Sequence, residues 1–234
     1  MKRKKSLIIG GSRGNGLEIL KELKIRGDYV INVSRSKNDK AHKNITLDLL
    51  DEKYLKILMT KLGKTKIDAL IFSQRYRGTK FEEEMQVMVN SCKDIINKLR
   101  NNLSEYASVV FLSSIVIKSI ADQEANYYIA QSSRNILVKY FAIKFNKNRV
   151  RFNSILPSKM IKKENRSFFK KNKKKKLFLT KINPLKKIPT SKDTAKLVGF
   201  LTSDDSRMIN GESIKIDGGL NLHGHEELLS NFFK

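Results

Sequence analysis

The sequence predicts an α/β fold with one doubly wound parallel sheet of about seven strands, in a single domain that spans residues 1–234. Its 234 residues are 40% hydrophobic, which is enough for one sizeable core. Short β-rich runs alternate with longer helical patterns along the whole chain. The three prolines form no linker that would divide the chain. This alternation implies right-handed crossovers, with helices covering both faces of the sheet.

The elements follow from hydrophobic periodicity. Runs rich in β-branched and aromatic residues predict strands near residues 6–10, 29–34, 44–47, 67–72, 108–113, 150–155 and 213–217. Patterns between them, several with apolar residues at i, i+3 and i+4, predict helices at about 15–26, 51–62, 83–103, 125–146 and 191–202. Parallel sheets of this kind bind ligands at the carboxyl ends of their strands. We therefore expect the functional residues directly after strands.

The charge balance is strongly basic, with 48 Lys plus Arg against 23 Asp plus Glu and a formal net charge of +25. The lysines are spread along the chain, and no basic motif with interleaved aromatic residues is present. We expect non-specific adhesion to polyanions and no specific nucleic-acid partner. Residues 170–176 (KKNKKKK) are the densest cluster, and like-charge repulsion favours a solvated, mobile loop there over a specific anion site.

Several classes of protein are excluded. The longest nearly apolar run, residues 108–117, is about half of the ~20 residues that a membrane helix needs, so we expect no membrane partner. The apolar stretch at residues 7–9 is too short for the core of a secretion signal. A single cysteine, Cys92, favours a reducing, cytoplasmic setting. His223 and His225 can chelate a metal, but a surface tail explains them better, so we predict no metal site.

A glycine-rich loop, residues 9–16 (IGGSRGNG), joins the first predicted strand to the first predicted helix. Its glycines permit a tight turn and close backbone approach to a phosphate, and the helix N-terminus favours negative charge. A turn that serves only packing is the alternative, but the position between strand and helix favours a nucleotide site. The candidate cofactor contacts in this loop are Gly10, Ser12, Arg13, Gly14, Asn15 and Gly16.

The end of the second predicted strand indicates which cofactor would bind. An NAD site normally carries an acidic residue there for the ribose 2′-hydroxyl. This chain has Ser34, Arg35 and Ser36 instead. A guanidinium donates two hydrogen bonds to a phosphate, whereas a carboxylate repels it. The sequence therefore predicts NADP(H) over NAD(H), with Arg35 and Ser36 among its contacts.

These motifs resemble the short-chain dehydrogenase/reductase (SDR) family, close to the 3-oxoacyl-carrier-protein reductase type, over about residues 6–222. Residues 9–16 are similar to the family's TGxxxGxG loop, and Ser114 precedes Tyr127 by the 13 residues that the family pattern expects. Residues 201–220 (LTSDDSRMINGESIKIDGGL) are similar to the family's C-terminal signature. The resemblance implies a Rossmann-type fold and an oxidoreductase.

The resemblance also implies roles for individual residues. Tyr127 would donate a proton to the developing alkoxide, and Ser114 would polarise the carbonyl oxygen. Asn90, in the segment VMVNS, would hold a water chain to solvent. Asp48, in LDLLD, would contact the adenine, and Pro157 stands at the family's PG motif. Each residue alone has an ordinary structural explanation, so their joint order and spacing carry the assignment.

The sequence departs from the family pattern at the YxxxK motif, where Gln131 replaces the lysine. Its amide can contact a ribose hydroxyl but has no charge to stabilise a tyrosinate. Arg134 and Lys162 are candidate substitutes for that charge. In addition, residues 72–75 (FSQR) replace the family's NNAG motif. Two functions therefore remain open: an NADP(H)-dependent reductase interconverting a carbonyl and a secondary alcohol, or a catalytically weakened protein that binds NADP(H) as a structural or regulatory ligand.

The resemblance further implies a substrate lid and an assembly. Residues 159–188 occupy the family's variable loop, and their lysines would attract an anionic substrate such as an acyl thioester, carrier-bound or not, or an acidic sugar. The predicted helices at 83–103 and 125–146 would join subunits in a homotetramer or dimer. The apolar residues of the C-terminal tail, residues 221–234, would cover either a neighbouring subunit or their own domain.

Overall fold

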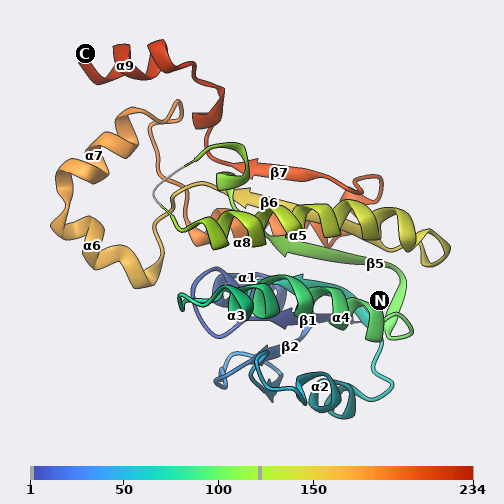
Figure 1. The fold of residues 1–234 in the computed structure, drawn as a ribbon. Helices are drawn as coiled ribbons and strands as arrows, with labels where there is room; N and C mark the ends of the chain where they lie inside the picture. Colours follow the sequence, from blue (N-terminus) through green and yellow to red (C-terminus); the bar gives the residue numbers. More distant parts are fainter. Residues whose placement is uncertain (1–2, 121–122, 234) are drawn as a thin grey trace.

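The computed structural model describes residues 3–120 and 123–233 as helices packed around one sheet (Figure 1). Seven parallel strands run in the order β3-β2-β1-β4-β5-β6-β7. They are β1 (Lys5–Ile9), β2 (Tyr29–Ser34), β3 (Lys43–Thr46), β4 (Ile67–Phe72), β5 (Leu103–Leu112), β6 (Arg151–Pro157) and β7 (Ser213–Ile216). The strand order reverses between β1 and β4, which is where such sheets bind ligands. The predicted doubly wound α/β fold is confirmed.

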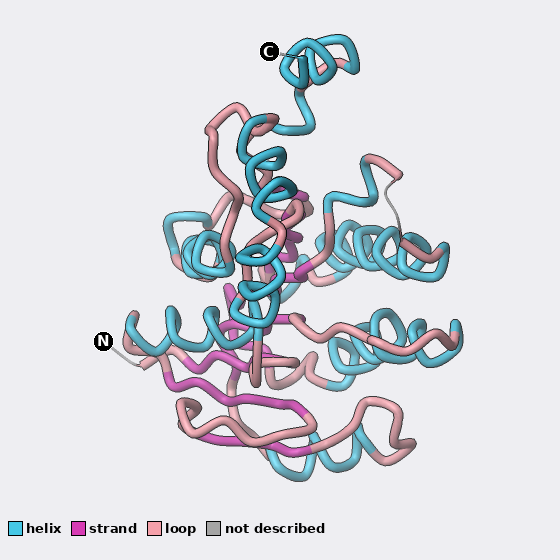
Figure 2. Tube along the Cα trace, turned by 90° about the vertical axis from the view of Figure 1, so that its left-hand side faces the viewer, coloured by secondary structure: helices cyan, strands magenta, loops and turns pink. Residues whose placement is uncertain are grey.

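Helices lie on both sides of the strands (Figure 2). They are α1 (Gly14–Ile25), α2 (Tyr54–Leu62), α3 (Phe81–Met85), α4 (Ser91–Lys98), α5 (Ala125–Lys144), α6 (Arg166–Lys171), α7 (Lys173–Lys181), α8 (Ser191–Leu201) and α9 (His225–Phe233). One buried cluster joins the sheet to α1 and α8, and a larger one joins its other face to α2, α4 and α5.

The sequence of the central strands explains why both faces are covered. In β1, Leu7 and Ile9 pack into the larger cluster, whereas Ile8 between them packs against α1 and α8. All three side chains are at most 1% exposed. Neighbouring residues of a strand point to opposite faces, so a continuous apolar run requires a cover on each side. The helices on both faces therefore follow from these uniformly apolar strands.

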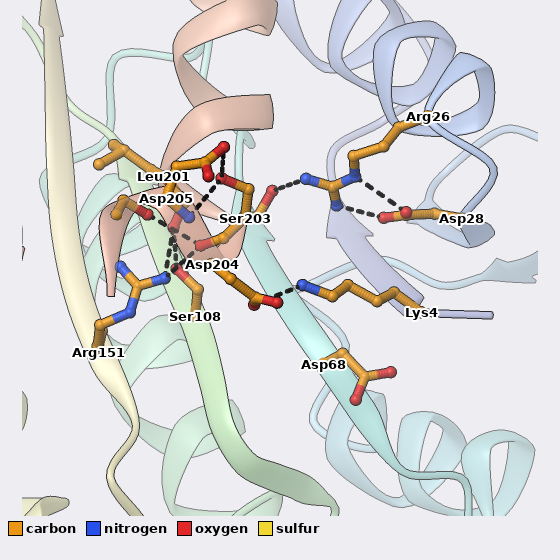
Figure 3. A network of polar contacts seen from close by, with 12 residues as sticks. Lys4, Arg26, Asp28, Asp68, Ser108, Arg151, Leu201, Ser203, Asp204 and Asp205 are labelled. Carbon is orange, nitrogen blue, oxygen red and sulfur yellow. Dashed lines mark hydrogen bonds and ion pairs between the residues drawn. The ribbon is translucent and has the colours of Figure 1, made fainter. Parts of the chain in front are cut away.

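The amino end of the sheet is closed by a network of polar contacts (Figure 3). Arg26 pairs with Asp28 at 2.5 Å, and Lys4 pairs with Asp204 at 2.9 Å. The Arg151 guanidinium donates to the carbonyls of Leu201 and Ser203 at 3.0 and 3.1 Å. These contacts hold the last turn of α8 against the strands. The candidate functional residues lie at the opposite, carboxyl end.

The predicted helix at 83–103 is wrong in its interior and at its end. A π-helical turn, Gln86–Asn90, separates α3 from α4, and α4 ends at Lys98. The Asn102 side chain donates to the carbonyls of Gly63 and Thr65, each at 2.9 Å. These bonds fix a turn before β5 begins at Leu103. Leu99 lies beyond the end of α4 but is fully buried in that turn. The apolar pattern of the sequence therefore continues past the end of the helix.

The lysine cluster at residues 170–176 is helical, so the prediction of a loop there is wrong. The cluster belongs to α6 and α7, which meet at Asn172 and extend away from the sheet (Figure 1). Lysine is a good helix former, and on the surface of a helix its ammonium group remains in solvent. Phe169, 2% exposed, anchors α6.

The C-terminal tail is helical as α9 and contacts α7. Its last residue, Lys234, lies outside the described residues. Across the described ranges, no helix combines the length and the apolar character that crossing a membrane requires.

Candidate active site

A cleft of about 1930 Å³ opens at the carboxyl ends of the central strands, around the reversal in strand order. It brings together most of the residues predicted from the sequence. The predicted residues that line it are Gly10, Ser12, Arg13, Gly14, Asn15, Arg35, Ser36, Asp48, Ser114, Tyr127, Gln131 and Pro157. Gly16 and Asn90 are not among its lining residues. The cofactor candidates and the catalytic candidates therefore share one continuous cavity.

The glycine loop has the conformation that only glycine adopts without strain. Gly10 and Gly14 have φ of +89° and +57°. A Cβ on Gly10 would lie 2.6 Å from the Gln74 backbone nitrogen, so the loop after β4 approaches the glycine backbone directly. Gly16 is buried, and a Cβ there would overlap the Gly10 carbonyl. Gly16 therefore shapes the loop from beneath, while Gly10 and Gly14 face the cleft.

An anionic group already occupies part of this loop. The Gly14 N–H donates to a carboxylate oxygen of Glu164 at 2.7 Å, at the first residue of α1. Backbone amides at a helix N-terminus favour negative charge, and here a side-chain carboxylate supplies it. The contact shows that the loop accepts an anion, so its residues fit the pyrophosphate of a dinucleotide.

The end of β2 presents an arginine at the edge of the cleft. Ser34 Oγ donates to the Ser36 carbonyl at 2.6 Å, which shapes the turn around Arg35. The Arg35 side chain is 66% exposed, and its Nη1 lies 4.0 Å from the Asp48 carboxylate. An exposed pair at that separation is weak. The guanidinium is therefore available to a phosphate in the cleft.

The catalytic candidates come from β5 and α5. Ser114 lies two residues after the end of β5, and its Oγ accepts a hydrogen bond from the Val116 N–H at 3.5 Å. Tyr127 and Gln131 lie one turn apart on α5 and both line the cleft. Gln131 is only 2% exposed, and its Oε1 is buried without a hydrogen-bond partner in the described part of the chain. Such an acceptor is suited to a ligand hydroxyl.

Arg134 and Lys162, the two candidates for the missing charge, differ in position. Arg134 is fully buried, and its guanidinium donates to the carbonyls of Phe72 and Gln74 at 2.9 and 3.4 Å. Burial lowers its pKa. Lys162 lines the cleft, and burial, followed by repulsion from Arg75 and Arg77, lowers the pKa of its ammonium group.

Sequence reasoning missed Arg75. Its guanidinium carbon lies 4.7 Å from the centroid of the Tyr127 ring. In the sequence, position 75 stands out only as a departure from NNAG. A long cation directly after a central strand, at the reversal in strand order, was the signal that could have found it.

Local sequence patterns did not predict the contact that Glu164 makes or the position of Asn90. Glu164 meets Gly14 across 150 positions of sequence, and no local pattern encodes that contact. Asn90 ends the π-helical turn and is half-buried, while Val87 and Met88 from the same turn line the cleft. The insertion of this turn was not visible in the periodicity, so its effect on which residues face the cleft was not predicted.

The family follows from a sequence comparison. A family model described as "Enoyl-(Acyl carrier protein) reductase" matches residues 40–221, more than half of the chain. The chain belongs to the SDR family. The resemblance read from its motifs is thereby confirmed at the level of the family.

Curated relatives of this SDR chain cover it to different extents. A tropinone reductase homolog of Arabidopsis thaliana is 34% identical over 122 residues, which cover 52% of this chain and 46% of the homolog. The chain thus spans about half the length of the first relatives that it matches. A 3-oxoacyl-acyl-carrier-protein reductase, FabG of Rickettsia conorii, is 26% identical over 93% of this chain and 96% of its own.

Solved structures share the fold. A short-chain dehydrogenase family protein from Francisella tularensis has a TM-score of 0.84 at 23% identity, covering 95% of this chain and 100% of its own. Aldohexose dehydrogenase from Thermoplasma acidophilum has a TM-score of 0.85 at 20% identity, covering 95% and 96%. ElxO, solved with NADP bound, has a TM-score of 0.80 at 20% identity, covering 95% and 100%. At these identities the likeness shows the fold alone.

Proposed function

We propose that this SDR protein is an NADP(H)-dependent oxidoreductase that interconverts a carbonyl and a secondary alcohol by hydride transfer. The observation that carries the proposal is the single cleft, in which the anion-accepting glycine loop and the Tyr127 side chain share one cavity. Two findings support the choice of cofactor: the family of the chain, and the similar structure of ElxO, which was solved with NADP bound.

The cofactor would lie across the carboxyl ends of the strands. The loop from Gly10 to Asn15 would hold the pyrophosphate, and Arg35 with Ser36 would hold the 2′-phosphate. Asp48 would contact the adenine. Gln131 would accept a hydrogen bond from a ribose hydroxyl through its unpartnered Oε1, and Pro157 would border the nicotinamide.

The chain's own residues would manage the proton. When bound, the reduced nicotinamide supplies the hydride to the carbonyl carbon. Ser114 would donate a hydrogen bond to the carbonyl oxygen, because a hydroxyl that accepts one hydrogen bond can still donate its own proton. Tyr127 would transfer its phenolic proton to the same oxygen, which becomes the alcohol. Asn90 would support proton supply from solvent through a water chain.

The substrate that we propose is anionic, such as an acyl thioester or an acidic sugar. Four cationic side chains of the cleft lining interact electrostatically with one another, and one of them, Arg75, contacts the Tyr127 ring: Arg13, Arg75, Arg77 and Lys162. Residues 159–188, with α6 and α7, would act as a lid over this end of the cleft. The similarity to a 3-oxoacyl-acyl-carrier-protein reductase fits a carrier-bound substrate. Opposite charge raises the local concentration of such a substrate and its association rate.

The test measures, by absorbance, the consumption of NADPH with each member of a panel of anionic and uncharged carbonyl compounds. We expect turnover with an anionic member of the panel. The turnover rate should fall at least about 100-fold in Tyr127→Phe, because general acid catalysis contributes at least that factor. NADPH binding should remain in the variant. Turnover that is unchanged in Tyr127→Phe would contradict the assigned acid.

One observation favours a second candidate function. Gln131, at the position of the family's lysine, is neutral and buried beside Tyr127 on α5. A catalytically weakened protein that binds NADP(H) as a structural or regulatory ligand would show tight NADPH binding with no turnover on the whole panel. Its thermal stability would still rise with NADPH, because ligand binding stabilises the folded state.

We also propose a homotetramer or dimer joined through α4 and α5. Ile129, Ile136, Tyr140 and Ile143 form one exposed apolar stripe along α5, each at least 46% exposed. An apolar groove lies beside the stripe, lined by residues that include Val89 and Leu137. Sedimentation of wild type and of Ile136→Glu tests this assembly: the wild type should sediment as an oligomer, and the variant as a smaller species.

A further inference from the structure

The position of Gln131 leaves an electrostatic problem at the catalytic tyrosine. A phenol that gives up its proton becomes an anion, and a nearby cation is needed to stabilise it. Gln131 provides only an amide one turn along α5. If Tyr127 works as proposed, the positive charge must come from another element of the fold.

Arg134 is not suited to that part. Arg134 lies on α5, seven residues after Tyr127, and interacts electrostatically with the Tyr127 hydroxyl. The side chain of Arg134, however, is 0% exposed. Its guanidinium is engaged by the carbonyls of Phe72 and Gln74 and packs against the Phe111 ring. It therefore contributes a fixed background charge from within the core, where it bonds to the last residue of β4 and to Gln74 in the loop that follows.

Arg75, unlike Arg134, lines the cleft. Its guanidinium carbon is 4.7 Å from the centroid of the Tyr127 ring, and its Nη2 donates to Gln123 Oε1 at 3.4 Å. A cation over the face of a neutral phenol is attracted by the ring alone. Ionisation adds a full negative charge to that ring, so the attraction is stronger for the phenolate. Arg75 thus favours the ionised form over the neutral one.

We propose that Arg75, from the loop after β4, supplies the positive charge that stabilises the Tyr127 phenolate, in place of the lysine that the family carries on α5. Arg75 is a positioning residue, since it acts through Tyr127. The proposal rests on the proposed function of Tyr127 as the acid and names the residue that sustains it.

The charged groups around the pair reinforce this direction. Arg77 lies two residues along the same loop, and Lys162 faces Arg75 from the segment after β6. Glu164 from that segment and Glu84 from α3 are the acidic groups in electrostatic contact with these cations. Burial raises the pKa of the Glu84 carboxyl, whereas Arg75 lowers it, so burial opposes its negative charge. Cations therefore outnumber carboxylates in this group around Arg75.

The decisive experiment follows ionisation of Tyr127 without any turnover. Tyrosine labelled with ¹³C at Cζ is titrated by NMR in the full chain, and the Tyr127 signal is assigned by its loss in Tyr127→Phe. We expect Arg75→Met to raise the midpoint by about one pH unit and Arg75→Lys to keep most of the wild-type value. Arg75 is exposed, so neither change should disturb folding.

Arg77→Met is the matched control, because it removes the same charge from the same loop but not the ring contact. It should move the midpoint less than Arg75→Met does. An unchanged midpoint in Arg75→Met, or an equal shift in Arg77→Met, would overturn the proposal. The titration needs neither cofactor nor substrate, so its result for Arg75 holds even for a protein that is inactive toward every carbonyl. Such inactivity would refute the proposed function alone.

A double variant tests whether Arg75 replaces the lysine. In Gln131→Lys the new ammonium lies one turn from Tyr127 and should stabilise the phenolate itself. Arg75→Met should then shift the midpoint by less than it does beside Gln131. Equal shifts in the two backgrounds would contradict a shared role.

Where turnover is measurable, its pH dependence gives a second readout. The midpoint of the alkaline limb of the pH–rate profile should move up by about one pH unit in Arg75→Met, which a merely structural role would not produce.

Discussion

The two ends of the sheet differ in how they hold charge. At the amino end, Arg26 pairs with Asp28 and Lys4 pairs with Asp204. Arg151 donates to three carbonyls, those of Leu201, Ser203 and Ile209. These contacts satisfy cations near the ends of strands and join α8 to the sheet, so they stabilise the fold.

The carboxyl end is arranged otherwise. Burial, followed by repulsion from Arg13 and Arg75, lowers the pKa of Arg77 there. Burial, followed by repulsion from Arg75 and Arg77, lowers the pKa of Lys162. Within the described ranges, Ser73 Oγ, Gln74 Oε1 and Gln131 Oε1 are buried without a partner. Repelling cations and unpaired polar atoms cost stability, so a fold tolerates them where a ligand completes them. The difference fits the binding that we propose at the carboxyl end, and it assigns a stabilising role to the polar contacts of the amino end.

The largest effect that would break this comparison is expected at the amino end. Arg151→Met removes the donor to three carbonyls and should lower the free energy of unfolding by about 3 kcal/mol. The dissociation constant for NADPH should not change. Urea denaturation and calorimetry measure the two quantities, with the exposed Arg207→Met as control. Weakened NADPH binding in Arg151→Met would mean that the two ends are coupled.

Next in size is an effect confined to the cofactor. Arg35→Gln removes the guanidinium at the end of β2 and should weaken NADPH binding by about 30-fold, or about 2 kcal/mol. NADH lacks the 2′-phosphate, so its affinity serves as the internal control and should stay the same. Stability should also stay the same, since the side chain is 66% exposed. Equal weakening of both cofactors would remove the assignment of Arg35.

A smaller effect of opposite sign is expected at the glycine loop. Glu164 accepts a hydrogen bond from the N–H of Gly14, which belongs to the loop that we propose for the cofactor's pyrophosphate. Glu164→Gln removes a competing negative charge and should tighten NADPH binding about fivefold, or about 1 kcal/mol. Glu226→Gln on α9 is a control for the loss of one carboxylate. Weaker NADPH binding in Glu164→Gln would show that this carboxylate supports the cofactor.

The smallest effect concerns pH. Burial, followed by Arg75 and Arg77, lowers the pKa of Lys162 below its ordinary value of 10.5. The ammonium is charged below that lowered pKa and loses its charge as pH rises through it, sooner than an exposed lysine does. The affinity advantage of wild type over Lys162→Gln for NADPH should therefore shrink, by about twofold, as pH rises from neutrality toward that ordinary value. A constant ratio across that range would exclude Lys162 from the anion site.

Much of the fold was predictable because its signals are local. The apolar runs of β1, β2 and β4 and the glycine loop each specify their own structure within a few residues. The interior of the segment 83–103 was misread because the apolar pattern does not mark the π-helical turn. Its end was misread because the Asn102 turn depends on the carbonyls of Gly63 and Thr65, far away in the sequence. Periodicity alone does not encode such contacts.

The site was predictable in part for the same reason. Arg35 and Tyr127 stand in motifs whose spacing implies their place, and both line the cleft. The contact of Glu164 with Gly14 and that of Arg75 with the Tyr127 ring join distant segments through side-chain geometry. Only the folded chain brings those pairs together, so the sequence showed a missing lysine without showing which cation stands beside the tyrosine.

Calorimetric titration of the purified chain with NADPH and with NADH tests the central claim most directly. The claim is that a dinucleotide binds over the glycine loop with its phosphates held by Arg35 and by the amides of Gly14 and its neighbours. It predicts saturable binding of both coenzymes, with NADPH the tighter by about tenfold or more. The absence of heat with either coenzyme, or tighter binding of NADH, would contradict it.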